Sequence, residues 1–115
     1  MSIFEAANAL KHCESEACKR DNKVYLHSFF LPPQIRPYYF TIHAFRLELF
    51  KTREMTEQST LRTNRIGWWL ENLNNIWQGN PAQEPISIAL NEMRKYTSVR
   101  KSHLERMVKG RVIFT

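Results

Sequence analysis

Apolar residues recur along most of the chain at the three- and four-residue spacing of α-helices. In the first segment this spacing predicts a helix from about residue 2 to residue 20, with Ser2 as its N-cap and Glu5 completing a capping box. Its apolar positions are Ile3, Ala6, Ala7, Leu10, Cys13 and Ala17. A short second helix runs from Val24 to Phe30 and must end at Pro32-Pro33, because proline lacks an amide hydrogen and disfavours helix in the residue before it.

A long third helix follows these prolines. Its apolar residues are Ile35, Tyr38, Tyr39, Ile42, Phe45 and Leu49. Pro37 is compatible with this helix because the first turn tolerates a missing amide hydrogen. The polar stretch 52–60 then predicts a loop or frayed turn.

A fourth helix is predicted by Leu61, Ile66, Trp69, Leu70, Leu73, Ile76 and Trp77. It ends at Gly79-Asn80-Pro81, and Pro85 starts a fifth helix that carries Ile86 to Met93. A sixth spans Ser102 to Lys109. Only residues 112–114 resemble a strand, and they are too few to pair convincingly. The sequence therefore predicts an all-α helical bundle, with residues 1–115 as one domain.

The composition supports a folded domain with a basic surface. The 115 residues are 43% hydrophobic and 24% charged, which excludes intrinsic disorder. The net charge of +6 suits an anionic partner such as a lipid headgroup or an acidic protein surface. Basic residues are scattered from Lys11 to Arg111 without a block of like charge, so a solvated basic face is favoured and nucleic-acid binding is not expected.

The cysteine and histidine positions predict no metal and no cofactor. Cys13 and Cys18 match neither a redox pair nor a zinc site, and we expect reduced thiols on one helix. The four histidines are dispersed along the chain. No apolar run approaches the roughly 20 residues of a membrane span, and no secretory or transit segment is visible in the sequence.

Two blocks of residues resemble the squalene/phytoene synthase family. The first is Tyr25-Leu26-His27-Ser28-Phe29-Phe30-Leu31-Pro32-Pro33-Gln34-Ile35-Arg36, followed by His43-Ala44-Phe45-Arg46. The second contains Arg65-Ile66-Gly67-Trp68-Trp69, Trp77-Gln78-Gly79-Asn80-Pro81 and Pro85-Ile86. Both agree in order and spacing over residues 18–111. The resemblance implies part of an isoprenoid-synthase-like helical fold.

The same resemblance implies that the chemistry of the enzymes is absent. Those enzymes bind prenyl diphosphates through magnesium held by two Asp-rich helices, whose carboxylates share one face. Here Phe50 and Lys51 occupy the first acidic positions and leave only Glu54, while the second acidic helix lies outside these 115 residues. Asp21 stands where the enzymes place a diphosphate-binding Ser. We expect a pseudoenzyme without catalytic residues.

Lys19-Arg20-Asp21, Tyr25-Leu26 and Ala44-Phe45 with Glu48-Leu49 resemble the non-catalytic mitochondrial branch of the family, the complex I assembly factor 6 group. The resemblance implies a protein of the matrix side of the inner membrane that binds complex I assembly intermediates. Cytoplasmic residence stays open because no transit peptide is visible. The alternatives are a prenyl-diphosphate-binding transferase fragment and a structural accessory subunit of a respiratory complex.

Four residues are candidates for binding: Arg36, Lys51, Arg53 and Trp68. Trp69, Leu73 and Trp77 share one helical face, which favours core packing, whereas Trp68 points elsewhere and is the preferred contact residue. Arg36 could equally contact an anion, cap a helix or form an ion pair inside the bundle.

The resemblance covers only the first part of a synthase-like bundle. We therefore expect a truncated domain whose inward residues Phe45, Leu49 and Trp69 lack their usual cover. Such a chain would form a homodimer, dock on a larger complex or have limited stability, and it could also touch an anionic membrane.

Overall fold

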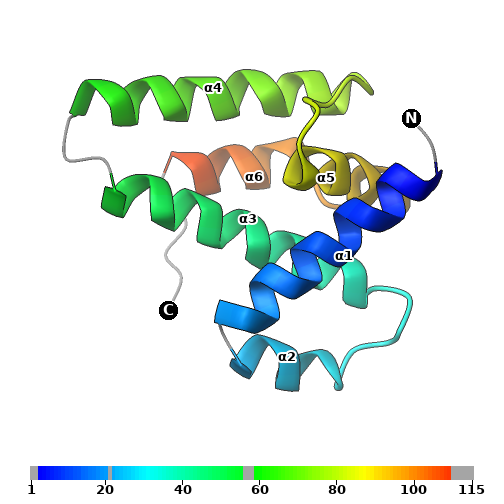
Figure 1. Ribbon diagram of the computed structural model, residues 1–115. Helices are drawn as coiled ribbons and strands as arrows, with labels where there is room; N and C mark the ends of the chain where they lie inside the picture. Colours follow the sequence, from blue (N-terminus) through cyan, green and yellow to red (C-terminus); the bar gives the residue numbers. More distant parts are fainter. Residues whose placement is uncertain (1–2, 21, 56–58, 110–115) are drawn as a thin grey trace.

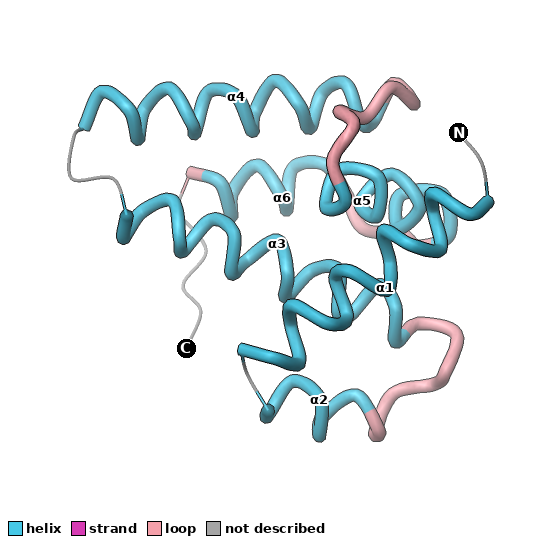
Figure 2. Tube along the Cα trace, in the orientation of Figure 1, coloured by secondary structure: helices cyan, strands magenta, loops and turns pink. Residues whose placement is uncertain are grey.

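The fold is all-α, as the sequence predicts. The computed structural model describes residues 3–20, 22–55 and 59–109, with the side chains of 5–19, 22–51 and 63–109. Its helices are α1 (Ile3–Arg20), α2 (Asn22–Ser28), α3 (Arg36–Met55), α4 (Ser59–Trp77), α5 (Pro85–Tyr96) and α6 (Lys101–Val108). Figure 2 shows only helices and connecting loops among these residues. None of the described helices has both the length and the apolarity to cross a bilayer.

The helices pack around α5 and α3. Helix α1 crosses α3 and also packs on α5, while α4 packs on α5 and α6 and touches α3 only slightly (Figure 1). Helix α2 lies at the edge of the molecule opposite α4.

One apolar core joins five of the six helices. Its largest fully buried side chains are Trp69, Phe45, Leu73, Ile76, Leu90, Met93 and Leu104. The prediction that Phe45, Leu49 and Trp69 lack cover is wrong, because their exposed fractions are 0%, 6% and 1%. The reason is that α1, α5 and α6 contribute residues to the same cluster. This chain buries its own inward faces.

The core prediction for α4 is confirmed. Trp69 and Leu73 are buried, and Trp77 is partly buried against the same cluster. The Phe45 and Trp69 rings meet edge to face, with centroids 5.1 Å apart.

Several boundaries differ from the sequence predictions. Helix α3 continues to Met55 and α4 begins at Ser59, so most of the predicted loop 52–60 is helical. Polar residues alone do not end a helix, and this stretch has neither Gly nor Pro. Helix α2 ends at Ser28, earlier than predicted. The predicted place of Pro37 in the first turn of the third helix is confirmed, because Pro37 is the second residue of α3. The predicted cap Ser2 and the strand-like residues 112–114 lie outside the described residues.

Candidate binding cleft beside helix α4

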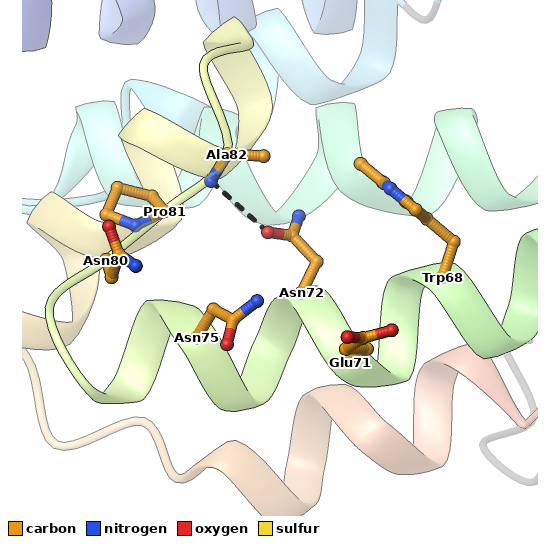
Figure 3. Close-up of a pocket in the computed structure, with 7 residues that line it drawn as sticks. All are labelled: Trp68, Glu71, Asn72, Asn75, Asn80, Pro81 and Ala82. Carbon is orange, nitrogen blue, oxygen red and sulfur yellow. Dashed lines mark hydrogen bonds between the residues drawn. The ribbon is translucent and has the colours of Figure 1, made fainter.

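A pocket of about 360 Å³ lies between α4 and the loop that leads to α5. It is lined by Trp68, Glu71, Asn72, Asn75, Asn80, Pro81 and Ala82 (Figure 3). The four α4 residues are spaced so that they share one helical face. Gly79, with a φ of +83°, turns the chain back over that face, a conformation that glycine adopts without strain. The pocket thus combines an aromatic wall with polar amides.

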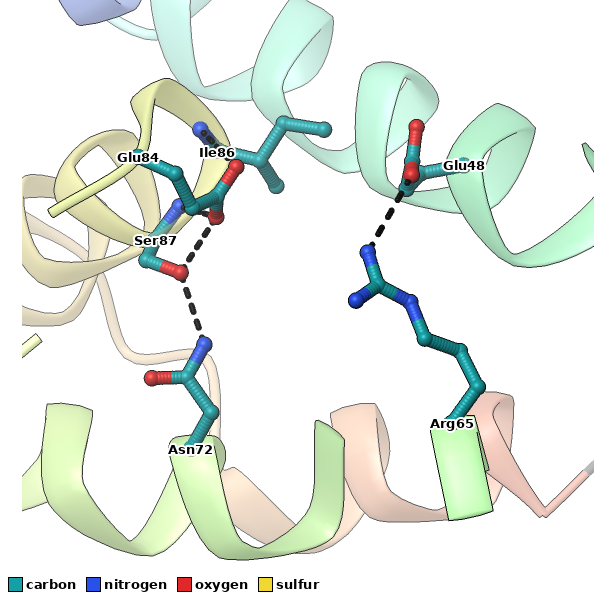
Figure 4. Close-up of polar contacts among 6 residues, drawn as sticks. All are labelled: Glu48, Arg65, Asn72, Glu84, Ile86 and Ser87. Atoms are coloured by element: carbon teal, nitrogen blue, oxygen red, sulfur yellow. Dashed lines mark hydrogen bonds and ion pairs between the residues drawn. The ribbon is translucent and has the colours of Figure 1, made fainter. Parts of the chain in front are cut away.

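A hydrogen-bond network fixes the loop that forms one wall. Asn72 is buried and donates from Nδ2 to Ser87 Oγ over 2.7 Å, while its Oδ1 accepts from the Ala82 amide at 3.3 Å. The Ser87 hydroxyl in turn donates to Glu84, the N-cap of α5 (Figure 4). Glu84 also accepts from the amides of Ile86 and Ser87, at 3.3 and 2.6 Å. Satisfied buried polar groups of this kind hold a loop in one conformation.

Trp68 forms the aromatic wall together with a stacked arginine. Its side chain is 37% exposed, and the Arg65 guanidinium carbon lies 4.7 Å from the Trp68 ring centroid. Arg65 Nη2 lies 3.6 Å from Glu48 Oε1 on α3. Because both partners are partly exposed, this ion pair contributes little stability and chiefly orients the guanidinium over the indole. The result is a preorganised Trp-Arg pair at the surface.

Lys51 lies beside a second, smaller pocket between α1, α3 and α5. This pocket of about 190 Å³ is lined by His12, Glu16, Ala44, Leu47, Glu48, Lys51 and Ile86. Glu48 therefore borders this pocket and also pairs with Arg65 beside the first one. Of the sequence-predicted residues, Trp68 therefore lines the first pocket and Lys51 lines the second.

Arg36 lies far from this region. It is at the start of α3, fifteen residues before Lys51, which corresponds to roughly 22 Å along a helix axis. Its Nε donates to the carbonyls of Ser28 at 2.9 Å and Leu31 at 3.1 Å, so the side chain closes the end of α2. Of the alternatives left open by the sequence, the structure shows the cap. The side chains of Arg53 and Glu54 lie outside the described residues.

The two cysteines lie on α1, as predicted, and both are free thiols. Burial raises the pKa of the Cys13 thiol from 9.0 to about 12, while a hydrogen bond with Thr41 works in the opposite direction. Burial also raises the pKa of Cys18, which is less enclosed. Neither is activated as a nucleophile, because nucleophilic cysteines need a lowered pKa.

The sequence interpretation missed Arg65, Asn72 and Glu84. Arg65 stands three residues before Trp68, a spacing that already places both side chains on one helical face. No spacing within α4 could have revealed the role of Asn72, because its hydrogen-bond partners lie beyond the turn at Gly79. Glu84 directly before Pro85 is a recognisable N-cap position.

Comparison with known proteins settles the family. Residues 18–114 match the squalene/phytoene synthase family. The chain belongs to that family. Its all-α fold agrees with this membership, and no solved structure matches the chain significantly.

Curated relatives carry the same printed name, "NADH dehydrogenase (ubiquinone) complex I, assembly factor 6". The Homo sapiens protein is 29% identical over 100 residues, which are 87% of this chain and 30% of that protein. The Bos taurus protein is 29% identical over 85 residues, 74% of this chain and 26% of that protein. The Mus musculus protein is 25% identical over 100 residues. The chain thus spans less than a third of the length of these relatives.

Helix α3 carries the residues that the sequence resemblance aligns with the first Asp-rich motif of the family's enzymes. Phe50, which the sequence resemblance places at the first acidic motif, is 57% exposed, and Lys51 next to it is partly buried. Within the described ranges, His, Cys, Asp and Glu side chains form no group of three that could hold a metal ion.

Proposed function

We propose that this squalene/phytoene synthase family chain is a non-catalytic protein that assists assembly of mitochondrial respiratory complex I by binding other proteins. The observation that carries the proposal is its similarity, over 87% of its length, to the human protein named for that role. The proposed partners are complex I assembly intermediates, and the proposed location is the matrix side of the inner membrane.

The α3 residues support the non-catalytic part of the proposal. The resemblance aligns Phe50 and Lys51 with the first acidic positions of the enzymes. An aromatic ring offers no oxygen ligand to magnesium, and a lysine cation repels it. We propose that this helix has lost its metal-binding role and that the chain is a pseudoenzyme.

The cleft beside α4 supports protein binding. Trp and Arg are the residue types most enriched among those that dominate protein interfaces. Trp68 is accessible, Arg65 is already stacked on it, and Glu48 holds the guanidinium. A side chain fixed before binding loses less conformational entropy when a partner arrives. We propose Trp68 as the principal contact residue, with Lys51 and Arg53 of α3 as further contacts.

The test is a native gel of respiratory complexes from cells depleted of this protein and rescued with the 115-residue chain. Rescue with Trp68→Ala should restore less complex I than rescue with the unchanged chain. Tyr96→Ala is the matched control, because Tyr96 is an aromatic residue on α5 with 69% of its surface exposed. Circular dichroism of the purified variants shows whether both remain folded.

Three results would contradict the proposal. Complex I levels that do not depend on the chain would remove the assembly role. Magnesium-dependent binding of farnesyl diphosphate by the purified chain would favour the transferase alternative. Stoichiometric recovery of the chain in the mature complex would favour a structural subunit.

A further inference from the structure

Helix α2 lies at the edge of the molecule opposite α4 (Figure 1). This helix and the turn after it carry exposed apolar side chains. These residues, here called the α2 patch, are Tyr25, Leu26, Phe29, Phe30 and Ile35, with exposed fractions of 43%, 50%, 55%, 87% and 42%. The inward side of α2 is packed against the rest of the protein. Val24 and Ser28 are buried, and Val24 packs against Ala17 and Phe40. The patch therefore faces outward and is not a gap in the core.

The charged residues closest to the patch in the sequence are mostly basic: Lys19, Arg20, Lys23 and Arg36, with one acidic residue, Asp21, among them. Residues 22–36 contain Lys23 and Arg36 but no Asp or Glu. Lys19, at the end of α1, is also exposed. Apolar and aromatic side chains flanked by lysine and arginine are typical of surfaces that insert shallowly into an anionic lipid interface.

The backbone of the turn suits a low-dielectric environment. The amides of Phe29, Phe30 and Leu31 donate to the carbonyls of Leu26, His27 and Ser28, at 3.3, 3.1 and 3.1 Å. Pro32 and Pro33 have no amide hydrogen, and the Ile35 amide donates to Pro32 at 3.1 Å. Arg36 Nε covers the Ser28 and Leu31 carbonyls. Lipid offers no partner to backbone groups, so a segment that satisfies its own donors loses little by entering the interface.

The aromatic residues are also held in place before binding. The Tyr25 and Phe29 rings meet edge to face with centroids 5.0 Å apart, and the Arg36 guanidinium carbon lies 5.8 Å from the Phe29 centroid. Phe30 protrudes beyond them.

We infer that the α2 patch is a membrane-docking surface that binds the headgroup region of an anionic bilayer. Phe30 and Leu26 enter the interface, while Lys19 and Lys23 contact anionic headgroups. The inference deepens the proposed function by naming the face that meets the membrane, and it rests on residues separate from the Trp68 cleft. Helices α2 and α4 lie at opposite edges of the molecule (Figure 1), so a chain docked through α2 keeps α4 away from the lipid.

The test is co-sedimentation of the purified chain with vesicles of phosphatidylcholine alone and with added phosphatidylglycerol. Phe30→Ser should weaken binding to the anionic vesicles roughly tenfold, because it removes one inserted aromatic side chain. Phe50→Ser, which changes a phenylalanine of 57% exposure on α3, should leave binding unchanged.

The charge contribution has its own control pair. Lys19→Gln with Lys23→Gln should weaken binding to anionic vesicles roughly tenfold. Arg106→Gln with Lys109→Gln, which makes the same change in net charge on exposed residues of α6 and its C-cap, should have a much smaller effect.

The inference is overturned if anionic vesicles do not sediment the chain, or if Phe30→Ser and Phe50→Ser bind equally. It is also overturned if analytical ultracentrifugation shows a dimer that Phe30→Ser dissociates while vesicles fail to bind, since the occupant is then a second copy. Vesicle binding by a chain that does not rescue complex I would contradict the proposed function alone. Rescue by a chain that does not bind vesicles would contradict only the membrane surface.

Discussion

Replacing Asn72 with alanine should destabilise the protein more than any change to an exposed asparagine of the same helix. Asn72 is 4% exposed and joins α4 to both the returning loop and α5. Its alanine variant removes the donor to Ser87 Oγ and the acceptor for the Ala82 amide together. The network that forms one wall of the cleft then loses its attachment to α4.

The expected loss follows from these two hydrogen bonds. Each is worth about 1 kcal/mol net, and the small cavity left by the amide adds to the loss, so the free energy of unfolding should fall by about 2–3 kcal/mol. Ser87 keeps its bond to Glu84, which limits the penalty for an unpaired hydroxyl. A domain of this size has a total stability of only about 5–15 kcal/mol.

Urea unfolding followed by circular dichroism measures the change. Asn74→Ala is the matched control, because Asn74 is exposed and its side-chain Oδ1 accepts an exposed hydrogen bond from Lys101 Nζ at 2.7 Å. It should change stability by less than about 0.5 kcal/mol. The double variant with Ser87→Ala should show a coupling of about 1 kcal/mol with Asn72→Ala. Equal losses for Asn72→Ala and Asn74→Ala, or full additivity with Ser87→Ala, would refute the reasoning.

Three further predictions concern the core, the turn and pH. Phe45→Ala should cost about 3–5 kcal/mol, because the ring is fully buried against Trp69, whereas the exposed Phe50→Ala should cost far less; chemical denaturation compares them. Gly79→Ala should cost about 1 kcal/mol, since alanine is strained at a φ of +83°, and thermal unfolding measures it. Burial raises the pKa of Cys13 from 9.0 to about 12, so its thiol ionises first in the unfolded chain. The contribution of the buried neutral thiol to the free energy of unfolding is therefore intact below pH 9. It falls by at most about 4 kcal/mol as the pH rises towards 12. Urea titrations at several pH values should show a flatter decline for Cys13→Ala.

The outward position of Trp68 could be predicted from the sequence, but the polar residues that line the pocket beside it could not. The helical period placed Trp69 in the core and turned Trp68 outward, because consecutive residues of a helix point about 100° apart. It could not reveal the Asn72 network, which depends on where the chain returns after Gly79. Nor could it show that Arg36 closes α2, since the competing roles of an arginine differ only in which acceptors come within reach.

What the sequence determined by itself was local: six helices, their proline and glycine boundaries, and the family resemblance carried by two blocks in register. The predicted loop 52–60 was too long, because residues 52–55 belong to α3 and residues 59–60 to α4, and polar residues without glycine or proline do not by themselves end a helix. Only the tertiary structure decided that Phe45, Leu49 and Trp69 are covered, because burial depends on residues from α1, α5 and α6 that lie far away in the chain. It also decided which apolar side chains remain exposed, among them those of the α2 patch, where a short helix buries one face and leaves another facing solvent.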